Sequence, residues 1–397
     1  MKKEEFFKEA RTDLTGPLAG VRVLDVTTSW AGPMCCNVLA DLGADVIKVE
    51  IPSGDVARAV SPVLPGTQVS FMHATVNRNK RSLVLDIRQE EECAKLLKIA
   101  EQTDIFVENF KVGTMSGYGL GFDDVRAVKP DIVYVSITGW GQSGPTVAAA
   151  GPAPPAHAAS GFLSVTGGPE SPPTKAGTFL ADDLSGLHGA IGAMAALRHR
   201  DQTGEGQHVD VALLDAMLFQ SNGLPTLGAM GIQPTRMGNE FGFAVPANVY
   251  DCEDGPVYVG VLLDAHWQIL APILGEPDLA ENPAFATRDD RAANRDVCNM
   301  LLGDWLKVRK RDEAINQLRE AGLPIAPVQT FVESAQDPHV LERDMLQPTE
   351  LQDGTTVPIT GPAVKFSRTP TRVRSPAPDL GEHNEEILAE FGIQKAD

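Results

Sequence analysis

The chain has 397 residues, of which 43% are hydrophobic and 22% are charged, which is typical of a folded globular protein long enough for two domains. Its formal net charge of −19 argues against binding nucleic acid through clustered phosphate contacts. A polyanionic ligand would therefore need a basic patch of its own, set against the field of the whole protein.

Targeting and redox signals point to a cytoplasmic protein. The N-terminus is charged and has no signal-peptide core, and no apolar run reaches transmembrane length, so we expect no membrane association. The five cysteines lack Cys-x-x-Cys spacing, so we expect reduced thiols and no metal site. They are Cys35, Cys36, Cys93, Cys252 and Cys298.

The first 150 residues alternate between predicted strands and helices. Runs rich in β-branched residues predict strands at 21–28, 43–50, 82–87, 104–109 and 131–137, and helices are expected at 34–42 and 89–103. Strand–helix–strand units of this length indicate a doubly wound α/β domain with a parallel sheet. The loop after the first strand is then the expected ligand-binding loop. Residues 145–176, rich in Pro, Gly and Ala, are predicted to form an irregular, ordered connection over a site.

Two adjacent carboxylates, Asp182 and Asp183, begin a helical pattern that reaches about residue 200. Gly186, Gly189 and Gly192 leave one face of that helix bare, which allows close approach by a backbone or a ligand. Acidic residues at a helix start commonly cap free N–H groups, whereas a nucleophilic carboxylate is the alternative. The local pattern leaves both open.

Beyond residue 200 the pattern of predicted elements changes at about residue 225, and a second, smaller domain is expected from there to about residue 330. A strand leading into a helix is expected from residue 208, followed by a β-hairpin at 246–251 and 257–262. Helical patterns then cover 266–274, 291–307 and 312–321, a proline-rich strand segment covers 348–378, and a short helix ends the pattern at 382–391.

A basic cluster at residues 77–82 contains Lys80 and Arg81, and Arg58 and Lys111 lie elsewhere in the first domain. A solvated turn before a strand and a phosphate grip on a nucleotide-like ligand are both compatible with this cluster. The glycines at 117–121 lack the spacing and position of a dinucleotide fingerprint, which makes a dehydrogenase a poor candidate.

Ordered motifs along the chain carry a resemblance to a known family. They are PLAGVRVLD (17–25), AGP (31–33), LGADVIKVE (42–50), NKRS (79–82), VENF (107–110), GWGQ (139–142), RMGN (236–239), DG (254–255), GLP (322–324) and LGEH (380–383). Over residues 17–390 the chain resembles the class III coenzyme A transferases, a family that also contains the α-methylacyl-CoA racemases.

The resemblance implies that Asp182, four residues before Gly186, is the nucleophile. Asp183 is then expected to fill the capping role that the local pattern indicates. Asp182 would attack an acyl-CoA thioester and pass through a mixed anhydride and an aspartyl-CoA thioester. Gln142 would lie near the acyl group, and the glycine-rich residues 139–144 would supply oxyanion donors.

The resemblance also implies contacts to coenzyme A, which acts as a substrate, with no tightly bound cofactor expected. The implied contact residues are Ser29, Trp30, Ala31, Arg58, Lys80, Arg81, Asn109, Phe110 and Lys111. Gly117 replaces a family arginine, for which Lys111 would substitute. His157 and Arg236 would bind the acceptor acid, which suggests a dicarboxylate such as succinate and succinyl-CoA as a candidate donor.

Two alternatives within the same family stay open. An α-methylacyl-CoA racemase needs a deprotonating pair, but its loop histidine aligns with Pro152, and His157 is five residues away. A CoA-binding subunit of a heteromeric transferase is the other alternative.

The family's architecture implies a Rossmann-like large domain built from both chain ends and a smaller α+β middle domain. The expected boundaries are 1–224, 225–330 and 331–397. Two chains would interlock as a homodimer, with a heteromer of related subunits as the alternative.

Overall fold

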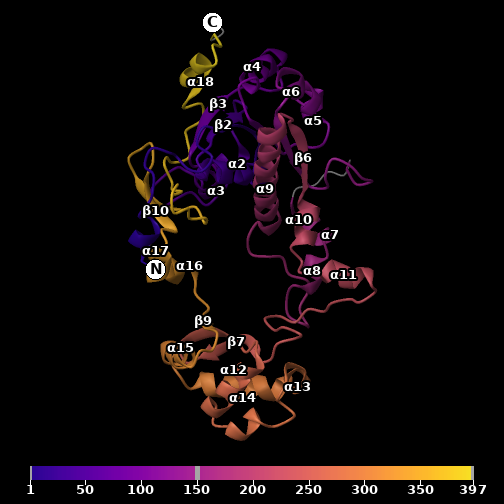
Figure 1. Ribbon diagram of the computed structural model, residues 1–397, viewed down its shortest axis with the longest axis vertical. Helices are drawn as coiled ribbons and strands as arrows, with labels where there is room; N and C mark the ends of the chain where they lie inside the picture. The colour runs from indigo at the N-terminus through magenta and orange to yellow at the C-terminus, as the bar shows by residue number, and fades with distance from the viewer. Residues whose placement is uncertain (1, 148–152, 395–397) are drawn as a thin grey trace. The chain divides into compact units, whose positions relative to one another are not determined.

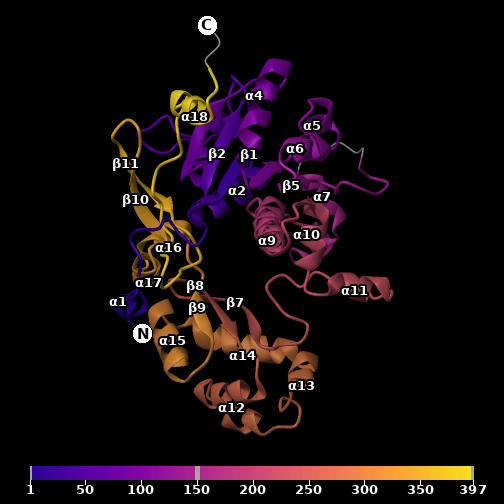
Figure 2. The same ribbon diagram turned by 45° about the horizontal axis from the view of Figure 1, so that its top comes forward.

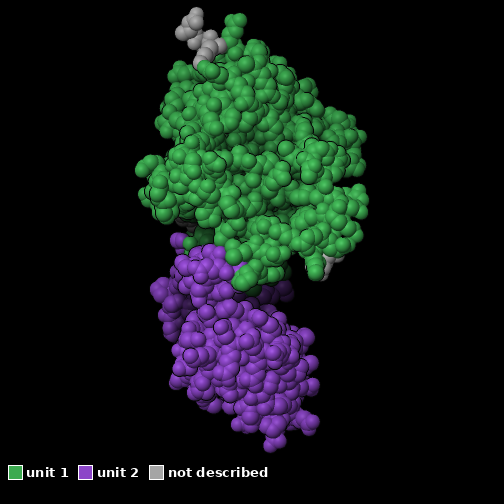
Figure 3. Space-filling model, turned by 90° about the vertical axis from the view of Figure 1, so that its left-hand side faces the viewer, with its two compact units in different colours: residues 1–162, 176–226, 338–397 green, residues 163–175, 227–337 purple. Residues whose placement is uncertain are grey.

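The computed structural model describes residues 2–147 and 153–394. The chain divides into two compact units, which Figure 3 shows in green and purple. The first unit comprises residues 1–162, 176–226 and 338–397, and the second comprises residues 163–175 and 227–337.

The first unit contains a six-stranded sheet, its helices and a hairpin near the C-terminus (Figure 1). Its elements are α1 (Lys3–Phe6), β1 (Arg22–Val26), α2 (Ala31–Asp41), β2 (Asp45–Glu50), η1 (Val56–Ala59), α3 (Phe71–Val76), β3 (Lys80–Val84), α4 (Glu90–Ala100), β4 (Ile105–Glu108), α5 (Thr114–Gly117), α6 (Phe122–Val128), β5 (Val133–Thr138), α7 (Ala153–Ala159), α9 (Leu180–Thr203), β6 (Gln207–Ala212), α10 (Leu213–Phe219), α17 (Pro338–Glu342), β10 (Leu346–Glu350), β11 (Thr356–Thr360) and α18 (Asn384–Glu390).

The six strands run parallel in the order β3-β2-β1-β4-β5-β6, which confirms the predicted parallel α/β sheet. The strand order reverses between β1 and β4. Ligands of such sheets bind at the carboxyl ends of the strands at this point, because the two loops diverge there. A ligand site is therefore expected at the loop after β1 and the loop after β4.

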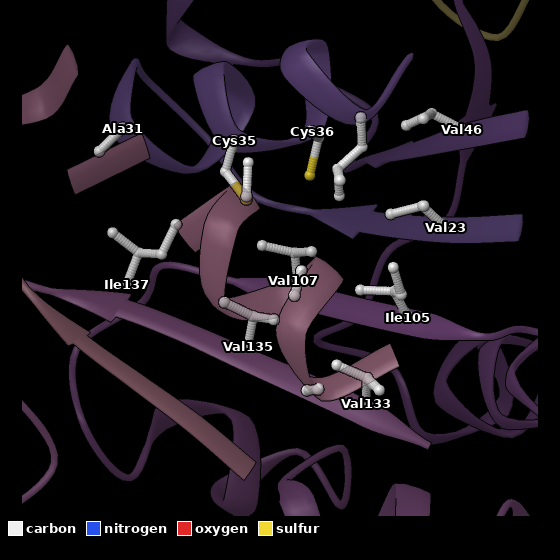
Figure 4. Packing of buried hydrophobic residues seen from close by; sticks show 14 of the residues in the cluster. Val23, Ala31, Cys35, Cys36, Val46, Ile105, Val107, Val133, Val135 and Ile137 are labelled. Carbon is white, nitrogen blue, oxygen red and sulfur yellow. The ribbon is translucent and has the colours of Figure 1, made fainter. Parts of the chain in front are cut away.

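Strands β1 to β5 are buried on both faces of the sheet, which explains their nearly continuous apolar sequences, whereas the edge strand β6 is largely exposed. Val23 and Val107 face the helices α2 and α9, whereas Leu24 and Phe106 face the side covered by α4 and α18. Figure 4 shows the first face, where Cys35 of α2 packs with Ile137 and other strand side chains. All five cysteines are buried and free.

The glycine face of α9 serves close packing within the protein. A Cβ atom at Gly186 would lie 2.8 Å from the carbonyl oxygen of Ala31 and 2.9 Å from the Cβ of Met34. At Gly189 a Cβ would lie 2.7 Å from Ile137. Helix α9 consequently lies against the N-terminal end of α2, and α10 lies beside it (Figure 2).

We expect Gly186→Val to destabilise the protein by about 1–3 kcal/mol, since the added side chain overlaps the backbone of α2 and one helix must move. Denaturant unfolding measures this loss. Ala195→Val is the matched control, because Ala195 is an exposed position of the same helix and the change should cost less than about 1 kcal/mol. Equal losses for the two variants would contradict the packing role of Gly186.

The second unit has a three-stranded antiparallel sheet in the order β7-β8-β9 and its own core, which includes the fully buried Trp267. Its elements are β7 (Ala247–Cys252), β8 (Gly255–Gly260), α12 (Asp264–Ile273), η2 (Pro277–Ala280), α13 (Arg288–Ala293), α14 (Arg295–Lys307), α15 (Arg311–Glu320), β9 (Ile325–Pro327) and α16 (Phe331–Gln336). The short helices α8 (Phe162–Val165) and α11 (Leu224–Ala229) cross the unit boundaries.

Three local differences from the sequence predictions affect the site. Strand β3 begins at Lys80, two residues earlier than predicted, and α9 begins at Leu180. Two short helices, α7 and α8, lie in the segment that was expected to be irregular. In the described part of the chain, no helix combines the length and the apolar character needed to cross a bilayer.

Candidate active site

A cavity of about 290 Å³ lies in the first unit at the point where the strand order reverses. Its walls come from the loops after β1, β4 and β5 and from the first turn of α9. The predicted site residues that line it are Ser29, Trp30, Ala31, Asn109, Phe110, Lys111 and Asp182. The fold thus brings residues from four separate parts of the sequence to one site.

The carboxyl group of Asp182 has an unusual electrostatic environment. Burial and, to a smaller extent, the neighbouring charge of Asp183 raise the pKa of Asp182 to about 7, against a hydrogen bond from its own backbone N–H that lowers it. A half-buried carboxylate near neutral pKa is more basic than an ordinary aspartate. This is the environment in which a carboxylate can act as a nucleophile or as a general base.

Asp183 does not cap α9, so this expectation from the sequence is wrong. The helix begins at Leu180 with Phe179 as the N-cap residue, and no side chain caps it. The Asp183 carboxylate instead accepts a hydrogen bond of 2.6 Å from the indole Nε1 of Trp30. Burial raises the pKa of Asp183, and the Trp30 hydrogen bond offsets part of that rise.

The loop after β1 is held in a strained conformation beside the cavity. Ser29 has a φ of 72°, in the left-handed region that side chains other than glycine seldom adopt. The carboxylate of Asp55 accepts hydrogen bonds from the backbone N–H of Ser29 and from the hydroxyl of Thr28. Asn109 exchanges two hydrogen bonds with the backbone of Thr28, so the loops after β1 and β4 are joined.

The segment after β5 supplies fewer backbone donors than the sequence suggested. The N–H groups of Gly141 and Gln142 already donate to the side chains of Thr138 and Asp210. Trp140, by contrast, lines the cavity, and its indole N–H is buried with no hydrogen-bond partner among the described residues. Sequence reasoning quoted Trp140 in a motif but gave it no role.

The predicted phosphate grip of Lys80 and Arg81 is not supported, because both cations are committed elsewhere. The Lys80 ammonium is fully buried, 2.7 Å from the Asp25 carboxylate, and its other hydrogen bonds go to Asn77 and to the carbonyl of Pro33. Arg81 binds Asp45 of β2, together with Glu386 and Glu390 of α18.

Arg58 also lies outside the cavity, with its guanidinium paired to the buried Glu50 and to the carbonyl of Pro378. A further buried lysine, Lys48, pairs with Asp55 and donates to the carbonyl of Thr27. The basic residues under the loop after β1 therefore support that loop from within the protein.

The remaining predicted site residues do not line the Asp182 cavity. The side chain of Gln142 lines a neighbouring polar cavity of about 430 Å³, which shares Lys111 and Val112 with the first. His157 is buried on α7 against Phe162. Arg236 belongs to the second unit, where it donates to backbone carbonyls at Ser164 and Gly168. Pro152, the position aligned with the racemase histidine, lies outside the described residues.

Sequence reasoning missed a second cavity, of about 310 Å³, that adjoins the first at Thr28 and Phe110. Its wall is largely apolar and includes Leu85, Tyr118 and Arg88. These residues lie in ordinary strand ends and turns, so no motif in the sequence marked them. Asp55 was also missed, although an aspartate before a short helical turn is a recognisable capping signal.

The first unit is thus a parallel α/β structure with a cavity at the carboxyl ends of its strands. The cavity holds an aspartate, Asp182, whose pKa is raised to about 7. A model of CoA-transferase family III matches residues 18–384, and the chain belongs to this family.

Proteins of known name and structure resemble the chain over nearly its whole length. It is 37% identical to the succinyl-CoA:mesaconate CoA-transferase of Haloarcula hispanica, over 95% of this chain and 97% of that protein. It is also 37% identical to the succinate–glutarate CoA-transferase of Agrobacterium fabrum, over 94% of this chain and 96% of that protein. A CAIB/BAIF family protein from Brucella suis shares its fold with a TM-score of 0.85 and 34% identity, over 95% of this chain and 100% of that one.

Proposed function

We propose that the protein transfers coenzyme A from an acyl-CoA donor, with succinyl-CoA as the first candidate, to a small carboxylic acid, and that Asp182 carries the acyl group and then the CoA. The observation that carries this proposal is the position of Asp182, a carboxylate of near-neutral pKa in a cavity, within a family III CoA-transferase chain. The similarity to transferases named for succinyl-CoA and for dicarboxylic acids supports the choice of donor and acceptor.

The proposed reaction conserves the energy of the thioester bond. The Asp182 carboxylate attacks the donor thioester, the C–S bond breaks, and a mixed anhydride and CoA thiolate form. The thiolate then attacks the aspartyl carbonyl, which releases the donor acid and leaves an aspartyl-CoA thioester. The acceptor carboxylate attacks this thioester to form a second anhydride, and the returning thiolate attacks the acceptor carbonyl and frees Asp182.

Each of these steps develops negative charge on a carbonyl oxygen, which a preorganised donor must stabilise. The candidate donors are the indole N–H of Trp140 and the ammonium of Lys111, because both residues line the cavity. Gln142 is assigned a contact to the acyl group, since its side chain lines the adjoining polar cavity.

The two adjoining cavities suit a long substrate. Ser29, Trp30, Ala31, Asn109 and Phe110 would contact the thioester end of acyl-CoA, while the cavity lined by Leu85 and Tyr118 would receive a more distant part. Arg88 is the cation in that second wall, so it replaces Lys80 and Arg81 in our proposal for a phosphate contact. Arg236 and His157 remain proposed contacts of the acceptor acid.

The substrate assignment is tested by incubating the protein with succinyl-CoA and, separately, mesaconate, glutarate, malate or acetate. Chromatography with mass detection then measures each acyl-CoA product. We expect product from at least one dicarboxylate and little from acetate, which lacks the second carboxylate. Equal turnover of acetate would remove the dicarboxylate assignment, and no product with any acid would remove succinyl-CoA as donor.

The racemase alternative gains no support from the described residues, because His157 does not line the Asp182 cavity. Deuterium exchange at the α-carbon of a 2-methylacyl-CoA, without any covalent adduct on the protein, would restore it. If the protein bound CoA but showed neither deuterium exchange nor a covalent adduct, the non-catalytic CoA-binding subunit would be favoured.

The pH dependence of the first step follows from the ionisation of Asp182. Only the ionised carboxylate is nucleophilic, and its pKa is about 7. We therefore expect the rate of adduct formation to rise about tenfold per pH unit below neutrality and to level off above about pH 8. Rapid acid quench with mass detection measures this rate, and a rate already constant from pH 5 upward would contradict the raised pKa.

The large-scale organisation is proposed from the resemblance to the family. The six-stranded sheet and its helices would form a Rossmann-like domain completed by both chain ends, and two chains would interlock as a homodimer. A heteromer with a related subunit is the alternative, which native mass spectrometry of the purified protein separates from a homodimer.

A further inference from the structure

The second carboxylate of the pair has no part in the proposed reaction, yet it is built into the site. Asp183 lies in the first turn of α9, directly after the proposed nucleophile. It caps no N–H group of the helix, and its hydrogen bond goes across the cavity wall to Trp30. Asp183 is a half-buried carboxylate without a cation partner among the described residues, and keeping such a group ionised costs free energy. This cost indicates that Asp183 has a role in the site.

Trp30 connects two separately held parts of the site. It follows the strained Ser29, whose N–H is fixed by Asp55, and its ring lies 5.0 Å from the ring of Phe179, just before α9. Its indole lines the same cavity as Asp182. The hydrogen bond from Trp30 to Asp183 is the polar tie between the loop after β1 and the start of α9.

We propose that Asp183 is a positioning residue of the Asp182 site. Asp183 fixes the Trp30 indole as a wall of the cavity, and its negative charge makes Asp182 a stronger nucleophile. This inference rests on the proposed function of Asp182.

The charge effect has a simple electrostatic origin. A like charge next to a carboxylate disfavours its ionisation, and a more basic carboxylate donates its electron pair more readily. Within the described residues, Asp183 is the one charged neighbour that raises the Asp182 pKa. Other titratable side chains on the elements packed against α9, or on the same cavity, are Cys35, Cys36 and Asp41 of α2, Tyr134 of β5, His208 and Asp210 of β6, Asp215 of α10, His157 of α7 and Lys111.

The test compares two variants at the same position. Asp183→Asn removes the charge but keeps an oxygen that accepts the Trp30 hydrogen bond. Asp183→Leu removes both. For each, the Asp182 carboxyl is titrated by carbon-13 NMR of aspartate-labelled protein, with Asp182→Asn to assign the signal, and adduct formation from succinyl-CoA is measured across pH.

We expect Asp183→Asn to lower the Asp182 titration midpoint by about one pH unit. The pH profile of adduct formation should move by the same amount, while the KM for succinyl-CoA stays within twofold. Asp183→Leu should give the same shift and also raise this KM several-fold, because the indole loses its anchor. Asp201→Asn, at the exposed end of the same helix, is the control and should change neither quantity.

An unchanged midpoint and profile in Asp183→Asn would overturn the charge role, and an unchanged KM in Asp183→Leu would overturn the anchoring of Trp30. The NMR titration needs no substrate. If wild-type protein forms no adduct while the Asp182 midpoint still shifts in Asp183→Asn, the proposed function fails and the electrostatic coupling stands.

Discussion

Asp182→Ala is expected to abolish the covalent adduct and to lower turnover by at least about 10³-fold, because both intermediates of the proposed reaction are bonded to this carboxylate. The variant retains the cavity walls, so binding of CoA should persist. The folded state should not suffer, since the substitution removes a partly buried carboxyl group whose ionisation is unfavourable in place.

The measurement is mass spectrometry of protein incubated with succinyl-CoA and then trapped with hydroxylamine or borohydride. Wild-type protein should carry a modification on the peptide that contains Asp182, and Asp182→Ala should carry none. Asp215→Ala, which removes an aspartate of α10 outside the cavity lining, is the matched control and should form the adduct normally. An adduct at any other residue, or full turnover by Asp182→Ala, would remove the proposed nucleophile.

Strands β1 to β5 of the sheet were predictable because they are buried on both faces. Segments such as β1 and β5 are short runs rich in β-branched and aliphatic residues, and this pattern identifies a buried strand without knowledge of its neighbours in the fold. The glycines of α9 were equally informative, since a bare helix face implies a close neighbour. The sequence left open whether that neighbour is a backbone or a ligand, and the contact of Gly186 with Ala31 decides for the backbone.

The roles of individual charged residues were harder to predict, because they depend on partners distant in sequence. Asp183 was predicted to cap the helix because the start of the helix was predicted two residues too late. Since α9 begins at Leu180, the carboxylate of Asp183 instead accepts a hydrogen bond from Trp30, 153 residues away in the sequence. Lys80 was assigned a phosphate contact because its motif matches that of the family, and the alternative was a solvated turn, since short charge clusters usually face water. A signal was present nonetheless, as Asp25 interrupts an otherwise apolar strand and therefore requires a buried partner.

The pairing of Lys80 with Asp25 leads to the second large expectation: Lys80→Met should lower the free energy of unfolding by about 3–5 kcal/mol. Both side chains are fully buried. Burial alone would raise the pKa of Asp25, but the charges of Lys48 and Lys80 outweigh it and hold that pKa below its usual value. Methionine fills a similar volume, so the loss reflects the uncompensated carboxylate and the two other hydrogen bonds of the ammonium, to Asn77 and Pro33.

Denaturant unfolding of four variants, Lys80→Met, Asp25→Asn, their combination and Lys129→Met, separates this core role of Lys80 from a phosphate grip. Lys129→Met removes a partly exposed lysine that pairs with Asp131 at 2.9 Å, and such a pair should cost less than about 1 kcal/mol. The double variant Asp25→Asn/Lys80→Met should lose less stability than the sum of its single changes, because removing both charges leaves neither unpaired. A Lys80→Met protein with wild-type stability and a tenfold higher KM for succinyl-CoA would instead show that Lys80 contacts the substrate. The burial of its ammonium beneath the loop after β1 leads us to expect the opposite: a large loss of stability, with the KM of the folded protein changed only as far as that loop relaxes.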